Sequence, residues 1–441
     1  MKHHISIRNL GPISNCECCI DEFTIFTGPQ SNGKSTVAKA IYFFRTIKQD
    51  IISLMQQGGP KMVSGNSKAT WNSTVTQRLR VKFLELFGTS WIMPSDMCIT
   101  YSYSSGSWIK VFLKDSYENE KNYIYFELSE SIKDFLLDLD NHSFLNLTKG
   151  QLQFEEKNLN KLFADEYETV FIPAGRNLIT LLSSQLNYIF TSLEGSQLRS
   201  LDYITKRYTE LILKLKPMFS NGLRDILVQA KEDPDSIKKL YPNKSAINRL
   251  ICTAESVLRG SYRYVDGEER LYIDDRKYVK INFASSGQQE IVWVFNLLFY
   301  YLLENKKVFL IIEEPESHLF PDSQQQIAEL LSMFKNKGNQ ILVTTHSPYI
   351  LGTLNYLLYA NQIQVSDTNA LKRVVDKAYW LRSDTTSAYY VASGTMLPAV
   401  DEEMDLKLIK NELIDGASQT INEKIDSLLS LSVSSEEQDE P

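Results

Sequence analysis

Cysteine and long apolar runs are both scarce in this 441-residue chain. Its five cysteines are too few for a disulfide framework in a chain of this size. The N-terminus lacks the apolar run of a secretory signal, and the longest apolar stretch, 291–303, is interrupted by Asn296 and is too short to cross a bilayer. We therefore expect a cytoplasmic protein with no membrane association.

Three of the cysteines, Cys16, Cys18 and Cys19, lie close together and follow His3 and His4 in the sequence. Two interpretations are open, a metal site or small buried residues of a strand. The C-x-C-C run lacks the C-x-x-C spacing that metal sites usually have, which favours the buried strand.

A general excess of positive charge is also missing. The formal net charge of −7 excludes a protein whose whole surface attracts nucleic acid. The stretch 195–260 is a local exception, because it holds twelve Lys or Arg against seven Asp or Glu. An ordinary solvated helical face or a surface for DNA or an acidic partner would explain it, so DNA binding through 195–260 stays open.

The most informative stretch that is present is residues 28–36, G-P-Q-S-N-G-K-S-T, which fits the P-loop pattern G-x-x-x-x-G-K-[ST] at every fixed position. Strand-like residues 22–27 precede it and helix-like residues 37–44 follow. Backbone N–H groups of such a loop face one anion, and the lysine reaches the β- and γ-phosphates. The pattern predicts a site for ATP and Mg²⁺, and the residues expected to form it are Gly28, Asn32, Gly33, Lys34, Ser35 and Thr36, with Ser35 as a ligand of Mg²⁺.

A second group of motifs follows in the last third of the chain. The turn 284–290, A-S-S-G-Q-Q-E, opens into the apolar helix 291–303 and gives a second helix N-terminus that could receive a phosphate. The apolar run 308–312 predicts a strand buried on both faces, and it ends in E-E-P-E, where open α/β sheets bind ligands. A further buried strand, 340–345, delivers His346.

The remaining elements are expected from alternation and turn signals. We expect a strand at 5–10, a turn at 11–12 and a second strand running to the P-loop, so that a hairpin feeds the nucleotide site. Elsewhere we expect a loop at 58–73, an antiparallel meander of 98–103, 108–113 and 123–128, a helix at 131–139, a strand at 169–172, helices over 177–219, strands at 270–273, 278–283, 378–381 and 388–391, a helical end and the acidic tail 434–441.

In this order, the P-loop, the S-S-G-Q-Q turn, the strand ending in E-E-P-E-S-H and the T-T-H-S segment resemble the ABC-type ATPases of the RecF, SMC and OLD branch. The resemblance implies an α/β fold, an ABC-type ATPase head with a mixed sheet, an antiparallel β subdomain and a helical insertion. It divides the chain into an N-terminal ATPase lobe with P-loop and meander at 1–176, a helical insertion at 177–260, and a C-terminal ATPase lobe with a C-terminal extension at 261–441.

The same resemblance implies roles for single residues of the ATP site. Lys34, Ser35 and Thr36 match the Walker A motif. Glu313 matches the acidic residue that holds Mg²⁺, usually through water, and Glu314 matches the general base that polarises the attacking water. His346 matches the switch histidine.

Across a dimer, the resemblance implies that residues 284–288 act as the signature sequence L-S-G-G-Q. Ser285 and Gly287, with Gln288 beside them, would then meet the nucleotide of the opposite subunit. The residues 317–319 match the D-loop. Arg176 resembles an arginine near that position in OLD-like ATPases, and a structural salt bridge is an equal alternative.

Two function classes follow from the resemblance. In the first, the chain is an ATP-binding and ATP-hydrolysing switch subunit that assembles through its ATPase heads and holds or releases a separate effector such as a nuclease; the ATPase subunits of PARIS-type and Septu-type anti-phage systems look similar. In the second, it is a RecF-like repair ATPase that clamps DNA directly. The short insertion, the acidic pI and the E-E-P-E-S-H form favour the first.

A nuclease of its own is not expected in this chain. Two-metal nuclease chemistry needs several carboxylates that converge on a shared metal pair. The dense acidic groups outside the ATP site are 401–405, expected as a solvated turn or helix start, and the acidic tail. The sequence therefore predicts that any nucleic-acid cleavage belongs to a partner.

Overall fold

A mixed sheet of 11 strands runs through the molecule in the order β6-β5-β4-β1-β2-β14-β13-β3-β12-β11-β7. The computed structural model describes residues 2–60, 70–114, 123–141, 148–180, 202–274, 276–364, 368–403, 406–410, 413 and 422–426. The strands are β1 (His3–Leu10), β2 (Ile13–Ile20), β3 (Phe23–Thr27), β4 (Cys98–Ser102), β5 (Trp108–Lys114), β6 (Tyr123–Leu128), β7 (Glu168–Ile172), β11 (Val308–Glu313), β12 (Gln340–Thr344), β13 (Thr386–Ala392) and β14 (Thr395–Pro398).

The five strands β13, β3, β12, β11 and β7 run parallel to one another. Every residue of β11 is buried, as expected for a strand covered on both faces. Its alternate residues enter different cores, because Leu310 and Ile312 join one hydrophobic cluster and Phe309 and Ile311 join another. The apolar run in the sequence therefore marks the centre of the molecule.

The other side of the sheet is antiparallel. β4, β5 and β6 form the expected meander, and β4 continues onto the hairpin of β1 and β2, which turns at Gly11 and Pro12. The second strand of this hairpin ends at Ile20, however, and a separate strand, β3, leads into the P-loop. Between β2 and β3 lie β14 and β13 from the end of the chain. The prediction that the hairpin itself feeds the nucleotide site is therefore wrong.

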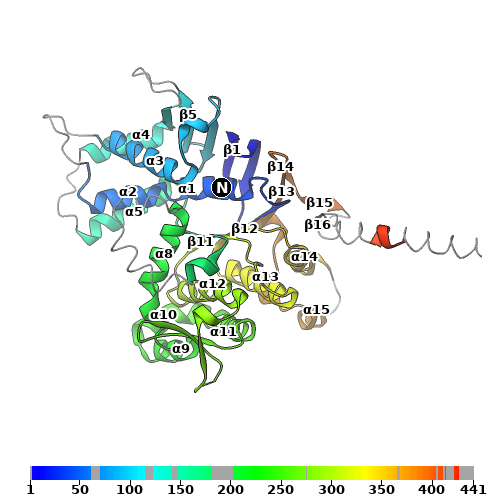
Figure 1. Cartoon of the computed structure of the whole chain (residues 1–441). Coiled ribbons are helices and arrows are strands. Elements are labelled where there is room, and N and C mark those ends of the chain that lie inside the picture. The colour runs from blue at the N-terminus through cyan, green and yellow to red at the C-terminus, as the bar shows by residue number, and fades with distance from the viewer. Residues whose placement is uncertain are drawn as a thin grey trace, which may run out of the picture.

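Helices cover both faces of the sheet (Figure 1). One core is built with the N-terminal helices α1 (Lys34–Arg45), α2 (Ile47–Gln56), α3 (Trp71–Phe87), α4 (Glu130–Asp140) and α5 (Lys149–Leu162). The other core is built with α8 (Tyr203–Leu215), α9 (Leu223–Glu232), α10 (Pro234–Leu240), α11 (Lys244–Leu258), α12 (Ser286–Leu303), α13 (Pro321–Asn336) and α14 (Pro348–Gln362). The short helix α15 (Thr368–Val374) follows α14.

A small antiparallel sheet of β8 (Ser261–Val265), β9 (Glu268–Tyr272) and β10 (Tyr278–Lys280) stands between α11 and α12. Together these elements confirm the α/β class, the mixed sheet with an antiparallel part, and the helical stretch after β7. The boundaries 1–176, 177–260 and 261–441 stay a prediction. None of the described helices is both long and apolar enough to cross a membrane.

Four local predictions need correction. The loop expected to reach residue 73 stops earlier, because α3 begins at Trp71 with the Thr70 side chain capping it. The strand expected at 278–283 ends at Lys280 and continues as a 3₁₀ turn. The strand expected at 378–381 begins as a 3₁₀ turn, in which the Asp376 side chain accepts a hydrogen bond from the amide of Ala378.

The fourth correction concerns the acidic group near residue 401. It lies in a strand, β15 (Val400–Glu403), paired with β16 (Leu406–Ile409), and not in a turn or helix start. Three consecutive acidic residues gave no strand signal in the sequence, and the strand forms through its pairing with β16. The expected loop segment 61–69, the helical segment 181–201 and the acidic tail 434–441 lie outside the described residues.

Cys16 and Cys18 are buried in β2, and Cys19 on the same strand is half-buried. His3 on the neighbouring β1 bonds to the hydroxyl of Tyr101 and to Arg45 instead of a cysteine. The burial of Cys16 and Cys18 confirms that they are small residues of a buried strand.

Candidate functional site

The loop between β3 and α1 has the backbone form that its glycines predict. Gly28 and Gly33 have φ of 133° and 98°, conformations that residues with a Cβ rarely adopt. A Cβ on Gly28 would also lie 2.2 Å from the carbonyl oxygen of Val391 on β13. The loop therefore has no room for a side chain at Gly28. Ser35 and Thr36 lie in the first turn of α1, where Ser35 is exposed and Thr36 is half-buried.

The Lys34 ammonium group is held inside the loop. Its Nζ donates hydrogen bonds to the carbonyl oxygens of Gly28 at 2.7 Å and Pro29 at 2.8 Å. Burial lowers the pKa of Lys34, whereas the charges of Glu314 and Glu316 act to raise it. The P-loop lysine thus lies within the electrostatic reach of the carboxylates that follow β11.

The hairpin between β13 and β14 supports the loop from the C-terminal part of the chain. The amide of Ser393 donates to Asn32 Oδ1 at 3.0 Å, and Asn32 Nδ2 donates to the carbonyl of Gln30. The Asn32 side chain therefore positions the loop, and its backbone N–H is the group left to face an anion. The sequence predicted a strand at 388–391 but neither β14 nor the place of this hairpin beside the P-loop, because β13 and β14 also pair with β3 and β2, which are far away in the sequence.

Glu313 is the last residue of β11, and its side chain is 6% exposed. Glu313 Oε2 accepts a hydrogen bond from the amide of Ala174 at 3.2 Å, while its Oε1 is buried without a hydrogen-bond partner among the described residues. A buried carboxylate oxygen without a donor is costly unless a cation or ordered water meets it. Mg²⁺ in nucleotide sites is usually held by one or two side chains plus phosphates and water, so Ser35 and Glu313 suit it.

Glu314 begins the turn after β11 and is only partly buried. Its φ of 42° lies in the left-handed region, which is uncommon for a residue with a side chain and is found often at functional sites. Its amide donates to the carbonyl of Thr344 at 2.8 Å, which ties this turn to the end of β12.

His346 follows β12 and reaches the same turn. Its Nδ1 lies 3.7 Å from Glu314 Oε1 and 3.8 Å from Glu316 Oε1. Glu316 is 5% exposed, and its Oε1 accepts from the amide of His346 at 3.0 Å and the hydroxyl of Thr345 at 2.6 Å. Glu316 therefore fixes the segment that carries His346, a role that sequence reasoning missed and that only its place within E-E-P-E-S-H could have suggested.

The signature turn, residues 284–288, forms a capped helix start. The Ser285 side chain accepts from the amide of Gln288, and Gln288 Oε1 accepts from the amide of Ser285, which makes a capping box for α12. Gly287 packs so closely on the D-loop that a Cβ there would lie 2.6 Å from the carbonyl oxygen of His318. Ser285 is exposed, and Phe283 beside it is 81% exposed.

The structure thus brings together the P-loop and the residues that follow β11 and β12. The signature turn contacts the D-loop through Gly287. Among the described residues, however, the side chains of Ser285 and Gln288 bond to each other and to the carbonyl of Leu258, and not to the P-loop.

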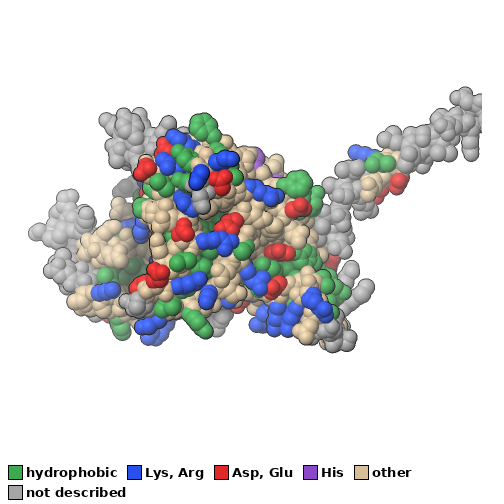
Figure 2. Space-filling model, turned by 90° about the horizontal axis from the view of Figure 1, so that it is seen from below, with side chains coloured by type: hydrophobic (Ala, Val, Ile, Leu, Met, Phe, Trp, Pro, Cys, Tyr) green, Lys and Arg blue, Asp and Glu red, His purple; other side chains and the backbone are tan. Residues whose placement is uncertain are grey.

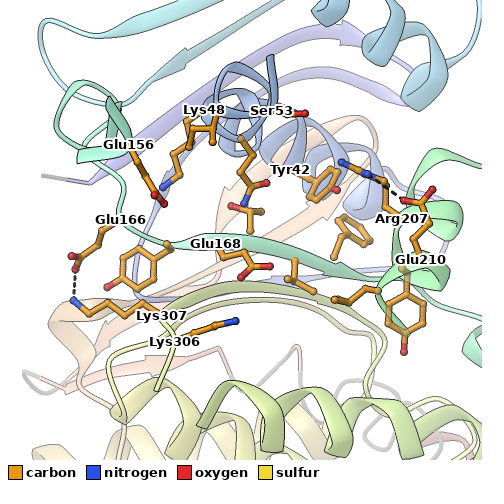
Figure 3. Close-up of a pocket in the computed structure, with 18 of the residues that line it drawn as sticks. Tyr42, Lys48, Ser53, Glu156, Glu166, Glu168, Arg207, Glu210, Lys306 and Lys307 are labelled. Carbon is orange, nitrogen blue, oxygen red and sulfur yellow. Dashed lines mark hydrogen bonds and ion pairs between the residues drawn. The ribbon is translucent and has the colours of Figure 1, made fainter. Parts of the chain in front are cut away.

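A cavity of about 750 Å³ lies elsewhere, along the edge strand β7 and the helices α2, α5 and α8 (Figure 3). Its wall carries charges of both signs, and several of them are paired, as the Lys307–Glu166 and Arg207–Glu210 contacts in Figure 3 show. None of the site residues predicted from the sequence lines it. The cavity is therefore separate from the candidate ATP site.

The described part of the basic stretch 195–260 holds several ion pairs. Lys216 forms a buried pair with Glu269, and exposed pairs join Arg224 to Glu255, Lys239 to Glu304 and Arg249 to Asp376. Figure 2 shows Lys and Arg side chains interspersed with Asp and Glu over the face seen from below. These pairs favour a solvated helical face over a continuous surface for DNA.

Comparison with known proteins gives a family match and several similar folds. The model of the AAA ATPase domain family matches residues 1–351. Among solved structures, an Smc head bound to the C-winged helix domain of ScpA shares 10% identity at a TM-score of 0.41, covering 94% of this chain and 99% of that chain.

Two further structures are similar. The Smc head with an extended coiled coil, bound to the C-terminal domain of ScpA from Pyrococcus furiosus, shares 12% identity at a TM-score of 0.37 and covers 96% and 99% of the two chains. The SMC head domain from Thermotoga maritima shares 13% identity at a TM-score of 0.35 and covers 90% and 98%. No curated protein matches the chain in sequence.

Proposed function

The chain belongs to the AAA ATPase domain family, and we propose that it binds ATP at the P-loop around Lys34 and hydrolyses it with Glu314 as general base. The observation that carries this proposal is the convergence of Lys34, Glu314 and His346 at the carboxyl ends of β3, β11 and β12. Phosphates bind at such strand ends, where a helix N-terminus adds its positive potential.

The proposed reaction is an in-line attack of water on the γ-phosphorus. The backbone N–H groups of residues 28–36 and the Lys34 ammonium would bind the phosphate oxygens, once Lys34 leaves the carbonyl groups that hold it now. Mg²⁺, when bound by Ser35 and Glu313, would neutralise negative charge on the phosphates. Glu314 would accept a proton from the attacking water. His346 would keep the Glu314 carboxylate in a fixed position relative to the end of β12.

We further propose that the active unit is a head-to-tail pair. Ser285, Gly287 and Gln288 lie on an exposed helix start whose N–H groups can face the nucleotide of a second subunit. Supporting this, the described side-chain hydrogen bonds of Ser285 and Gln288 stay within the signature turn or go to the carbonyl of Leu258, and do not reach the P-loop of the same chain. Nucleotide binding would then control association.

As a biological role, we propose a switch subunit that holds or releases a separate effector, such as a nuclease, in anti-phage defence. It is favoured over a RecF-like DNA clamp by the ion pairs of Lys216, Arg224, Lys239 and Arg249, which neutralise part of the positive charge described in 202–260. The test is purification of the tagged chain together with the product of its neighbouring gene, with and without ATP. Nucleotide-dependent association that is lost in Lys34→Ala supports the switch, whereas tight DNA binding without any protein partner supports the clamp.

A further inference from the structure

The side chain of Arg176 lies between the end of β7 and the proposed catalytic turn, and it is 1% exposed. Its Nη1 donates to the carbonyl oxygens of Pro173 at 2.9 Å and Glu313 at 2.6 Å, and its Nη2 donates to the carbonyl of Glu314 at 3.0 Å. The guanidinium therefore binds the carbonyl groups of the two peptide bonds that flank Glu314.

Arg176 is also bound to α12, the helix that begins with the signature turn. Its Nε lies 3.1 Å from both the carbonyl oxygen and Oε2 of Glu290. The Glu290 carboxylate also accepts from the amides of Arg176 and Asn177, each at 3.1 Å, and is itself 1% exposed. The Arg176–Glu290 pair is thus a buried ion pair whose hydrogen bonds are largely satisfied, the arrangement in which such a pair is rigid.

The residue held by this arrangement is strained. Glu314 has a φ of 42°, a left-handed conformation that is unfavourable for a residue with a side chain, so neighbouring contacts must maintain it. Both of its backbone polar groups are bound, the amide by the carbonyl of Thr344 and the carbonyl by Arg176. A small displacement of the Arg176 guanidinium would move the peptide that aims the Glu314 carboxylate.

We propose that Arg176 is a positioning residue that couples the signature helix α12 to Glu314. Contact of a second subunit with Ser285 shifts or steadies α12, Glu290 moves with its helix, and Arg176 transmits this to the backbone of Glu314. The signature turn then regulates hydrolysis within its own chain, in addition to any contact with the nucleotide of the opposite subunit. This inference rests on the proposed ATPase function.

The test compares Arg176→Lys with Arg45→Lys. Lysine keeps the charge but cannot bind Glu290 and the two carbonyls at once. The control arginine, Arg45, is equally buried in an ion pair, with Asp165, away from the 313–316 turn. We expect Arg176→Lys to retain ATP affinity within about 3-fold but to lower kcat at least about 10-fold, a loss typical of a displaced general base. Arg45→Lys should leave both constants near those of the wild type.

The coupling itself is tested by the dependence of turnover on protein concentration. In the wild type, turnover per chain should rise as subunits associate. In Arg176→Lys, association measured by sedimentation should persist while this rise is lost, and adding Ser285→Arg should cost little further activity, because coupled residues are non-additive. A merely structural role of Arg176 would lower both association and affinity instead.

Glu290→Gln serves as the second variant if Arg176→Lys does not fold, since it keeps the shape of the side chain and removes its charge. Its kcat should fall with ATP affinity unchanged. If the wild type binds and hydrolyses ATP but both folded variants retain full kcat, the coupling is refuted while the ATPase function stands. A wild type without turnover refutes the proposed function and this inference with it.

Discussion

The carboxylate of Glu314 and the ring of His346 lie side by side, with 3.7 Å between Oε1 and Nδ1. They belong to turns that follow neighbouring parallel strands, β11 and β12. The second turn is fixed by Glu316, which accepts a hydrogen bond from the His346 amide. A water molecule beside these two side chains would have a base and a hydrogen-bonding ring on the same side, an arrangement that suits activation of a water for attack on a γ-phosphate.

The first prediction concerns the ammonium group of the P-loop. Lys34→Ala removes a charge-assisted donor worth about 1.5–3 kcal/mol, so ATP should bind roughly 10- to 100-fold more weakly. Equilibrium binding of a fluorescent ATP analogue measures this. Lys39→Ala is the matched control, because Lys39 lies on the same helix but pairs with Asp202. Equal affinity of Lys34→Ala and wild type would remove Lys34 from the nucleotide site.

The second prediction is a composite site between two subunits. Lys34→Ala destroys the P-loop of one chain, and Ser285→Arg blocks the signature turn of the other. A mixture of the two variants contains heterodimers with one intact P-loop facing one intact signature turn, so phosphate release should reappear although each variant alone is inactive. As a control, a chain with both changes is mixed with Lys34→Ala and should stay inactive. Absence of any recovery, with heterodimers present, would argue for a site within one chain.

The sequence predicted the sheet centre and the backbone form of the P-loop because both depend on local signals. The apolar run before Glu313 indicates burial on both faces, and the P-loop glycines indicate a backbone form, without reference to the rest of the chain. The contacts that hold the residues of the site in place could not be predicted from local signals. Ser393 meets Asn32, and Arg176 meets Glu290, through pairings that depend on the completed sheet.

Errors in the prediction have the same origin. The strand expected at 378–381 begins instead as a 3₁₀ turn, because the side chain of Asp376 caps that turn. Asp401 lies in a two-stranded ribbon, where pairing with β16 outweighs the local charge. In both places a contact several residues away decides between two local conformations of similar energy.

The third prediction is that the chain cleaves neither DNA nor RNA. The Asp401 carboxylate forms a surface ion pair with the Lys410 ammonium group, with 3.5 Å between Oδ1 and Nζ. Purified protein incubated with plasmid, single-stranded DNA and tRNA, with ATP and Mg²⁺ or Mn²⁺, should leave all three intact. Cleavage that disappears in Asp401→Ala or Glu402→Ala, but persists in the P-loop variant, would make this chain the effector enzyme.

The fourth prediction concerns the pH dependence of folding. Burial, and next the charge of Arg45, lower the pKa of His3 from 6.5 to about 4, although Asp165 opposes this. Between these two values the unfolded chain binds a proton at His3 and the folded chain does not, so the free energy of unfolding falls as the pH drops from about 6.5 to 4. The loss is at most about 3 kcal/mol.

Denaturant unfolding at several pH values tests this assignment. His3→Gln should flatten the pH dependence of the unfolding free energy between 4 and 6.5. His4→Gln is the control, because His4 lies on the other face of β1 and is less buried. An unchanged slope in His3→Gln would place the titrating group elsewhere.

The fifth prediction bears on the chemistry itself. Glu314→Gln keeps the size of the side chain and its hydrogen-bonding reach but removes the basic carboxylate, so ATP should bind with nearly unchanged affinity while hydrolysis slows at least about 10²-fold. Lys34→Ala, which should fail at binding, separates the two steps. The decisive measurement is therefore single-turnover phosphate release by Glu314→Gln saturated with ATP. Tight binding with a rate at least about 10²-fold below wild type agrees with Glu314 as the general base, and release at the wild-type rate would contradict it.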